Sequence, residues 1–192
     1  MACALAAGLL LRRAERDAAA APTTQPVPAS ARPSQTPHRV MAGVFGLDAH
    51  AIMPGLGNTD DRTFVGAFQS IDRAIINPLF IPTFVGALLF TGLAGVLHLR
   101  EDVRSVLPWI VAAFVLYLAA FIITVRIHVP LDDEIKAAGD PDRISDLAGV
   151  RERFEDKWVR WNIVRAVTST AGLGCLAWAV LLHGRALQSA GV

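Results

Sequence analysis

The chain contains three long hydrophobic runs, and two of them carry no acidic or basic residue other than histidine. They cover Leu79 to Leu99, Val106 to Val125 and Ile163 to Leu182. A helix of about 20 apolar residues crosses the hydrocarbon core of a bilayer. A soluble domain of 192 residues could not bury three helices that are apolar on every side. The pattern therefore predicts three membrane-spanning helices, and the mean hydropathy of +0.44 agrees with that prediction.

A weaker apolar run, Val40 to Met53, precedes these three and ends at Pro54-Gly55. Its 14 residues would cover roughly 21 Å of the about 30 Å hydrocarbon core. This helix must therefore be shallow, shielded by its neighbours or extended through Arg39. With it, the sequence predicts an all-α, four-helix transmembrane bundle.

The composition changes at both ends of this bundle. We expect residues 1–39 to form a flexible Ala/Pro-rich tail, residues 40–185 the membrane domain and residues 186–192 a C-terminal tail. An apolar run precedes Arg12 in the tail, whereas a secretory signal carries its positive charge first. A misplaced start codon is an alternative explanation of this segment. Cys3 and Cys175 suggest no disulfide framework.

Two polar segments between the spans have helical periodicity. In the first, from Asp60 to Ile76, the apolar stripe is separate from Arg62, Asp72 and Arg73. The second is expected to begin at Asp140-Pro141 and to run into the last span. Both are expected to lie on the membrane surface or to cap the bundle, either as plain packing helices or as a lid over a site. The stripe of the first segment is Phe64, Phe68, Ile71 and Ile75.

Four helices of alternating direction would bring most of the unusual polar residues to one membrane face, together with both amphipathic segments. Lines of polar residues at helical spacing in the third and fourth spans would point inward. A guanidinium inside a span needs a partner, for which Asp132 is the first candidate and Asp48 the second. Alternatively, Arg165 extends to lipid phosphates and His128 only caps its helix. The residues on this face are Asp48, His50, Asn77, His128, Asp132, Asn162 and Arg165, and the two lines are Tyr117, Thr124, His128 and Asn162, Arg165, Ser169.

Four motifs resemble those of a small integral membrane family that includes the anthrone oxygenases of aromatic polyketide pathways. They are MPGL (53–56), FVGAFQSIDRAIINPLF (64–80), VPLDDEI (129–135) and FEDKWVRWNIVR (154–165) with the following Thr168-Ser169-Thr170. The resemblance covers residues 41–183. It implies a four-helix membrane fold and an oxygenase that oxidises an aromatic polyketide-type substrate with molecular oxygen.

The chain departs from the family pattern at three places. The family commonly has Asn-Val-Pro-Leu-Asn at 128–132, where this chain begins with His128 and ends with Asp132. It often has Asn-His-x-Arg at 162–165, where this chain has Ile163 in the second position. The first family helix also usually begins well before Met41. One hypothesis is that His128 takes over the basic role of the missing histidine.

The chemistry of an anthrone suits these residues. Removal of a proton from its ring methylene gives an anion that reacts with oxygen directly, so no bound cofactor is required. His128 or His50 would be the base, oriented by Asp132 or Asp48, and Arg165 and Asn162 would stabilise the oxyanion. An apolar cavity would take up the flat substrate from the bilayer. The expected substrate-binding residues are Asn77, Phe80, Phe84, Tyr117 and Trp161.

Other classes of function remain open. Asp48, His50, His128 and Asp132 could supply two imidazoles and a carboxylate for a metal, although no histidine pair has the i, i+4 spacing of a helical metal site. A non-catalytic membrane scaffold or a binding protein for a small hydrophobic ligand is the second class. Thr170 and Gly174 would favour a homo-oligomer through the fourth span.

The charge excludes a nucleic-acid partner, because 18 basic and 17 acidic residues give a net charge of only +1. The expected partners are the lipid bilayer, a small aromatic substrate and oxygen. We expect a multi-pass protein of the cytoplasmic membrane. The lysines and arginines are divided almost equally between the two faces, so the orientation is not predicted.

Overall fold

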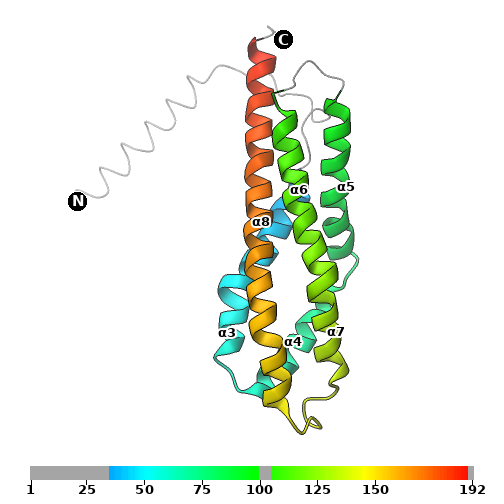
Figure 1. Cartoon of the computed structure of the whole chain (residues 1–192), viewed down its shortest axis with the longest axis vertical. Coiled ribbons are helices and arrows are strands. Elements are labelled where there is room, and N and C mark those ends of the chain that lie inside the picture. Colours follow the sequence, from blue (N-terminus) through cyan, green and yellow to red (C-terminus); the bar gives the residue numbers. More distant parts are fainter. Residues whose placement is uncertain (1–34, 100–104, 190–192) are drawn as a thin grey trace, which may run out of the picture. The chain divides into compact units, whose positions relative to one another are not determined.

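The computed structural model describes residues 35–99 and 105–189, and every regular element in these two ranges is a helix (Figure 1). Four helical stretches are long and apolar enough to cross a membrane, and they confirm the predicted four-helix transmembrane bundle. The stretches are Thr36–Gly57, Phe80–His98, Leu107–Ala137 and Leu147–Arg185. The first consists of α2 (Thr36–Leu47), the π-helical turn η2 (Asp48–Ile52) and α3 (Met53–Gly57).

The first span is longer than the sequence predicts. It begins at Thr36, so it extends through Arg39 into the last residues assigned to the tail, and it continues past Pro54. The predicted end at Pro54-Gly55 is therefore wrong. Proline has no N–H to donate to the preceding turn, and here η2 absorbs the disruption: the Met53 N–H bonds to the Asp48 carbonyl, five residues back. The rest of the tail lies outside the described residues.

The third span repeats this arrangement. It consists of α6 (Leu107–Ile123), the π-helical turn η3 (Thr124–His128) and α7 (Val129–Ala137). The Val129 N–H bonds to the Thr124 carbonyl, again five residues back, and Pro130 follows directly. Each π-helical turn thus ends two residues before a proline, and both helices continue for at least one further turn.

The second amphipathic segment begins later than predicted. The structure has a turn instead of a helix after Asp140, because the Asp140 side chain accepts the Asp142 N–H and its carbonyl accepts the Arg143 N–H. Helix α8 (Leu147–Ser189) begins after Asp146, whose carboxylate accepts the Gly149 N–H. From there it runs through the amphipathic segment into the last span without interruption, as predicted.

Helix α8 is the centre of the bundle. It packs along α6 and α2, and α5 (Phe80–His98) packs on α6 and α2. Gly172 permits the close approach of α8 to α6, since an added Cβ would lie 3.4 Å from the Ala113 carbonyl oxygen. The Tyr117 hydroxyl donates to the Phe84 carbonyl (3.0 Å) and ties α6 to α5. The hydrophobic core between α2, α5, α6 and α8 contains the buried residues Met41, Phe45, Phe84, Ala87, Tyr117 and Ala166.

The amphipathic helix α4 (Asp61–Ile75) caps the bundle next to α3, α7 and the start of α8 (Figure 1). Phe64 and Phe68 are buried, as the predicted stripe requires, whereas Ile71 is 37% exposed. Asp72, which was expected off the stripe, is buried and forms an ion pair with Lys136 of α7 (2.8 Å). The buried face of α4 is therefore rotated toward Asp72, because this ion pair compensates the burial of its charge.

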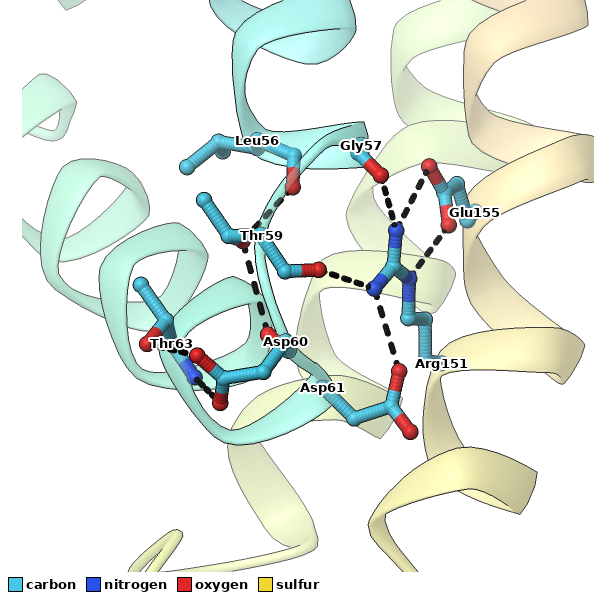
Figure 2. A network of polar contacts seen from close by, with 8 residues as sticks. All are labelled: Leu56, Gly57, Thr59, Asp60, Asp61, Thr63, Arg151 and Glu155. Carbon is cyan, nitrogen blue, oxygen red and sulfur yellow. Dashed lines mark hydrogen bonds and ion pairs between the residues drawn. The ribbon is translucent and has the colours of Figure 1, made fainter.

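Arg151 of α8 connects the α3–α4 turn to the bundle (Figure 2). Its guanidinium donates to the carbonyls of Gly57 and Thr59, both at 2.8 Å, and forms ion pairs with Asp61 (3.0 Å) and Glu155 (2.6 Å). It also lies 4.5 Å from the centre of the Phe64 ring.

At the same turn, Asp60 caps α4 by accepting the N–H and the hydroxyl proton of Thr63. The Thr63 hydroxyl and amide hold the pKa of Asp60 below its usual value. The contribution of this cap to stability is therefore present at neutral pH, and it is lost as the pH falls through the lowered pKa.

Replacement of Arg151 by methionine should release α4 from the bundle. The change removes the donor of two backbone carbonyls, so we expect a loss of about 2–3 kcal/mol in the free energy of unfolding. Thermal unfolding in detergent and protease cleavage at the α3–α4 turn measure the effect. Arg153→Met is the matched control, because Arg153 is exposed and its pair with Glu134 is long (3.7 Å). Equal stability of the two variants would contradict this role.

Candidate functional site

A cavity of about 210 Å³ lies where the π-helical turns face α8, and α4 and the start of α5 close its outer side. Its wall is mainly apolar and includes four phenylalanines and five isoleucines. At the inner end the wall contains Arg165 and two carboxylates, Asp48 and Asp132. The lining residues are Phe45, Asp48, Ile52, Met53, Phe68, Ile71, Asp72, Ile75, Ile76, Phe80, Ile81, Phe84, Thr124, Val125, Val129, Asp132, Asp133, Lys136, Trp158 and Arg165.

Arg165 is the central group of the cavity and is only 6% exposed. Its Nε and one terminal nitrogen donate to Asn162 Oδ1 (3.2 and 2.7 Å), and the other terminal nitrogen donates to Thr124 Oγ1 (3.3 Å). The guanidinium carbon lies 4.1 Å from the centre of the Phe45 ring and 5.6 Å from that of Trp158. Three of its five N–H donors are used, so two remain for a ligand.

Asn162 holds Arg165 in this position. It is fully buried, its amide nitrogen donates to the Phe45 carbonyl (3.3 Å), and its oxygen accepts both bonds from Arg165. One side chain therefore joins α8 to α2 and sets the orientation of the guanidinium.

The two carboxylates differ in their surroundings. Asp132 Oδ1 accepts the indole N–H of Trp158 (2.9 Å), which fixes its orientation. Asp48, on η2, lines the cavity, and its carboxylate accepts no hydrogen bond from any described residue. The Arg165 charge interacts with both carboxylates.

A second charged group lies in the cavity wall on α4 and α7. Lys136 forms ion pairs with Asp72 (2.8 Å) and Asp133 (3.1 Å). The cavity wall therefore carries charge in two places, around Arg165 and around the ion pair of Lys136 with the buried Asp72.

The structure brings part of the predicted site together. Asp48, Asp132 and Arg165 line the cavity, and so do Phe80 and Phe84. The members of the two predicted polar lines are also buried or partly buried: Tyr117, His128, Asn162, Arg165 and Ser169 are buried, and Thr124 is partly buried.

The expected partner of Arg165 has to be corrected. Neither Asp132 nor Asp48 forms a salt bridge with it in the described part of the chain, although both charges act on it across the cavity. The guanidinium bonds instead to Asn162 and Thr124, because these side chains lie on the same helix and on the facing π-helical turn.

His128 is buried but does not line the cavity. Its ring packs edge-on against Trp158 (5.1 Å between centres), and neither ring nitrogen has a hydrogen-bond partner among the described residues. A π-helical turn contains more residues than an α-helical turn, so η3 rotates His128 away from the line through Thr124. Its assignment as the base is therefore not supported by its position. Ile163, at the position where the family resemblance implies a histidine, is 47% exposed and does not line the cavity.

Four further expected site residues lie away from the cavity wall. His50 is exposed and bonds to the Gly46 carbonyl of its own helix. Asn77 is exposed, and its oxygen caps the start of α5 by accepting the N–H groups of Leu79 and Phe80 (both 2.9 Å). Trp161 is 37% exposed on α8, and Tyr117 lies in the core behind Phe84.

Three further residues at the inner end contact Arg165 and were not predicted as site residues. The rings of Phe45 and Trp158 lie near the guanidinium, and Thr124 accepts one of its hydrogen bonds. The i, i+7 spacing of Trp158 and Arg165 on one helix is a signal that could have identified the tryptophan. Phe45 gives no such signal, because its contact depends on the packing of α2 on α8.

The structure does not bring the candidate metal ligands together. His50 and His128 do not face the cavity, and the described residues contain no group of three His, Cys, Asp or Glu side chains that could hold a metal ion.

The fold and the site define a class: a multi-pass membrane protein whose four-helix bundle encloses a mainly apolar cavity with a buried arginine at its inner end. Residues 75–175, more than half of the chain, match the anthrone oxygenase family, and the chain belongs to that family. The matched part begins after Phe45 and Asp48, which α2 and η2 contribute. No curated protein and no solved structure matches the chain.

Proposed function

We propose that this protein is an oxygenase that converts an anthrone-type aromatic compound into the corresponding quinone with molecular oxygen and without a bound cofactor. The observation that carries the proposal is the free donor pair of Arg165 at the inner end of an apolar cavity, opposite the free carboxylate of Asp48. Membership of the anthrone oxygenase family supports the choice of substrate class.

Arg165 is proposed to bind the oxygen of the substrate carbonyl. Loss of a proton from the ring methylene moves negative charge onto this oxygen, and two N–H donors that are already oriented stabilise the charge as it develops. Asn162 keeps the guanidinium from turning toward the lipid. Because the cavity wall is apolar, the interaction is stronger than it would be in water.

Asp48 is proposed to accept the methylene proton. Its carboxylate has no hydrogen bond to lose, and it faces the cation that holds the substrate oxygen. Asp132 is less suited, because Trp158 occupies one of its oxygens. The family resemblance also implies that relatives commonly have an asparagine at position 132.

The reaction balances with oxygen as the only other reactant. Proton removal gives a carbanion conjugated with the carbonyl group of the substrate. Transfer of one electron to molecular oxygen, followed by combination of the two radicals, forms a carbon–oxygen bond. The resulting hydroperoxide loses water and leaves a ketone. One substrate and one oxygen molecule therefore give one quinone and one water, and the proton taken by Asp48 leaves with the water.

Three phenylalanines are proposed to hold the flat ring system. Phe80 stacks on Phe84 with nearly parallel rings (10° between planes), and Phe84 stacks on Phe121 in the same way (13°). Two of them, Phe80 and Phe84, line the cavity and provide a flat wall for an aromatic substrate.

Oxygen consumption by the detergent-purified protein with emodin anthrone tests this proposal. We expect uptake above the spontaneous rate that is insensitive to a chelator. Asp48→Asn should lower it about 10²-fold, whereas Asp132→Asn should lower it only a few-fold. Asp156→Asn on the exposed face of α8 is the control.

The outcomes separate the alternatives. Loss of activity in Asp132→Asn alone would assign the base to Asp132. Uptake that a chelator abolishes would contradict the cofactor-free reaction. Tight binding of the anthrone without any uptake would favour a non-catalytic protein that binds a small hydrophobic ligand.

A further inference from the structure

The two ends of the cavity have opposite character. Its inner end carries Arg165 and Asp48, whereas much of its outer rim is formed by branched apolar side chains that are themselves exposed. Ile76 is 59% exposed, and Ile81 and Val129 are each 45% exposed. The apolar rim consists of Ile71, Ile76, Ile81, Val125 and Val129.

The apolar rim lies at the end of two membrane spans. Ile81 is in the first turn of α5, and Val125 directly follows the first residue of η3. Figure 1 shows the start of α5 above α4, with α7 beside them. Exposed apolar residues continue on both sides of the opening, with Leu79 before it and Ile122 beside it. An opening toward water would expose this apolar surface at a considerable cost in free energy.

The charged part of the rim lies farther along α7. Lys136 and Asp133 follow Val129 by one to two turns, near the end of the third span. This order places apolar side chains toward the hydrocarbon core and charged side chains toward the headgroups.

We propose that the cavity opens sideways into the bilayer through the apolar rim, so that a ligand enters from the lipid with its acidic end first. The opposite end of the ligand then remains in the opening and contacts lipid. The ligand class is therefore an amphipathic aromatic compound that tolerates an apolar substituent remote from its acidic group and rejects a charged one there. The inference rests on the proposed site but not on its chemistry.

Trp158 provides a reporter inside the cavity. It lines the wall and is 5% exposed, whereas the other three tryptophans, Trp109, Trp161 and Trp178, are 37–42% exposed and can be replaced by phenylalanine. The protein with Trp158 alone is placed in lipid nanodiscs. The probes are two 1,8-dihydroxyanthraquinones, one with an octyl chain and one with a carboxybutyl chain on the ring edge remote from the hydroxyls. Quenching of Trp158 fluorescence measures binding.

The octyl probe should quench Trp158 at concentrations at least tenfold lower than the carboxybutyl probe. The double variant Ile81→Phe/Val129→Phe narrows the rim with side chains that do not fluoresce in this range, and it should weaken binding of the octyl probe at least tenfold. Val115→Phe is the matched control, because Val115 is 56% exposed on α6 and does not line the cavity. Its binding should be unchanged.

Equal binding of the two probes, or binding that the rim variants leave unchanged, would overturn the lateral opening even if the protein consumes oxygen with emodin anthrone. Binding with the expected pattern but without oxygen consumption would instead overturn the proposed reaction and leave the opening intact. All substitutions lie at exposed positions, and the thermal unfolding of each variant verifies its fold.

Discussion

Replacement of Arg165 by methionine should lower the rate of oxygen consumption with an anthrone about 10²–10³-fold, the usual effect of losing an oxyanion-stabilising donor. The stability should change little. Removal of a buried charge stabilises the bundle, and this gain offsets the loss at Asn162 Oδ1, which then has no donor. We expect the free energy of unfolding to change by less than about 2 kcal/mol.

The combination of lost activity and retained stability separates a role in the reaction from a role in folding. Oxygen uptake and thermal unfolding of the same preparation measure both. Arg165→Lys should recover only part of the rate, because a lysine supplies charge without the planar donor pair. Arg160→Met, at an exposed position of the same helix, is the control and should behave like the wild type. Unchanged turnover in Arg165→Met would exclude the proposed oxyanion site.

Asn162→Leu should destabilise the bundle by about 3–5 kcal/mol, the largest loss of stability that we expect from a single substitution in this chain. The buried guanidinium of Arg165 loses two of its three hydrogen bonds, and the Phe45 carbonyl loses its donor. An uncompensated charge at this depth is far more costly than an apolar contact. Thermal unfolding in detergent measures the loss.

A double substitution tests the cause. In Asn162→Leu/Arg165→Met the charge is gone, so most of the lost stability should return, and the two effects should be strongly non-additive. Ser169→Ala is the matched control, since Ser169 is also fully buried on α8 but its hydroxyl has no hydrogen-bond partner among the described residues. Additive losses would indicate that Asn162 acts through its bond to α2 alone.

The membrane fold could be predicted because the residue composition of each span alone indicates that it lies in the hydrocarbon core. The apolar runs of α5 and α6 need no knowledge of their neighbours, and the polar lines with Tyr117 and Asn162 follow from helical spacing. Helix ends were less predictable. Asp140-Pro141 has the residue types of a helix start, but a turn stabilised by Asp140 precedes α8 instead.

For the site, the sequence predicted the membrane face on which the residues lie but not the direction of each side chain. Asp48, Asp132 and Arg165 line one cavity there, but His50 and Asn77, which were predicted for the same face, are exposed and do not line it. Depth in the membrane follows from position in the sequence, whereas the direction of a side chain depends on local helix geometry. The contact of Phe45 with Arg165 depends on tertiary packing and has no counterpart in a single helix.

The exact number of residues in the two π-helical turns determines which side chains face the cavity. Each turn contains one residue more than the α-helix that would replace it, and Pro54 and Pro130 stand two residues after the ends of the turns. Deletion of one residue from η2 would restore a regular helix and turn the whole of α2 by about 100° relative to α3. Phe45 would then lose its contact with Arg165. Insertions and deletions in these two short segments should consequently be as damaging as the loss of a site residue.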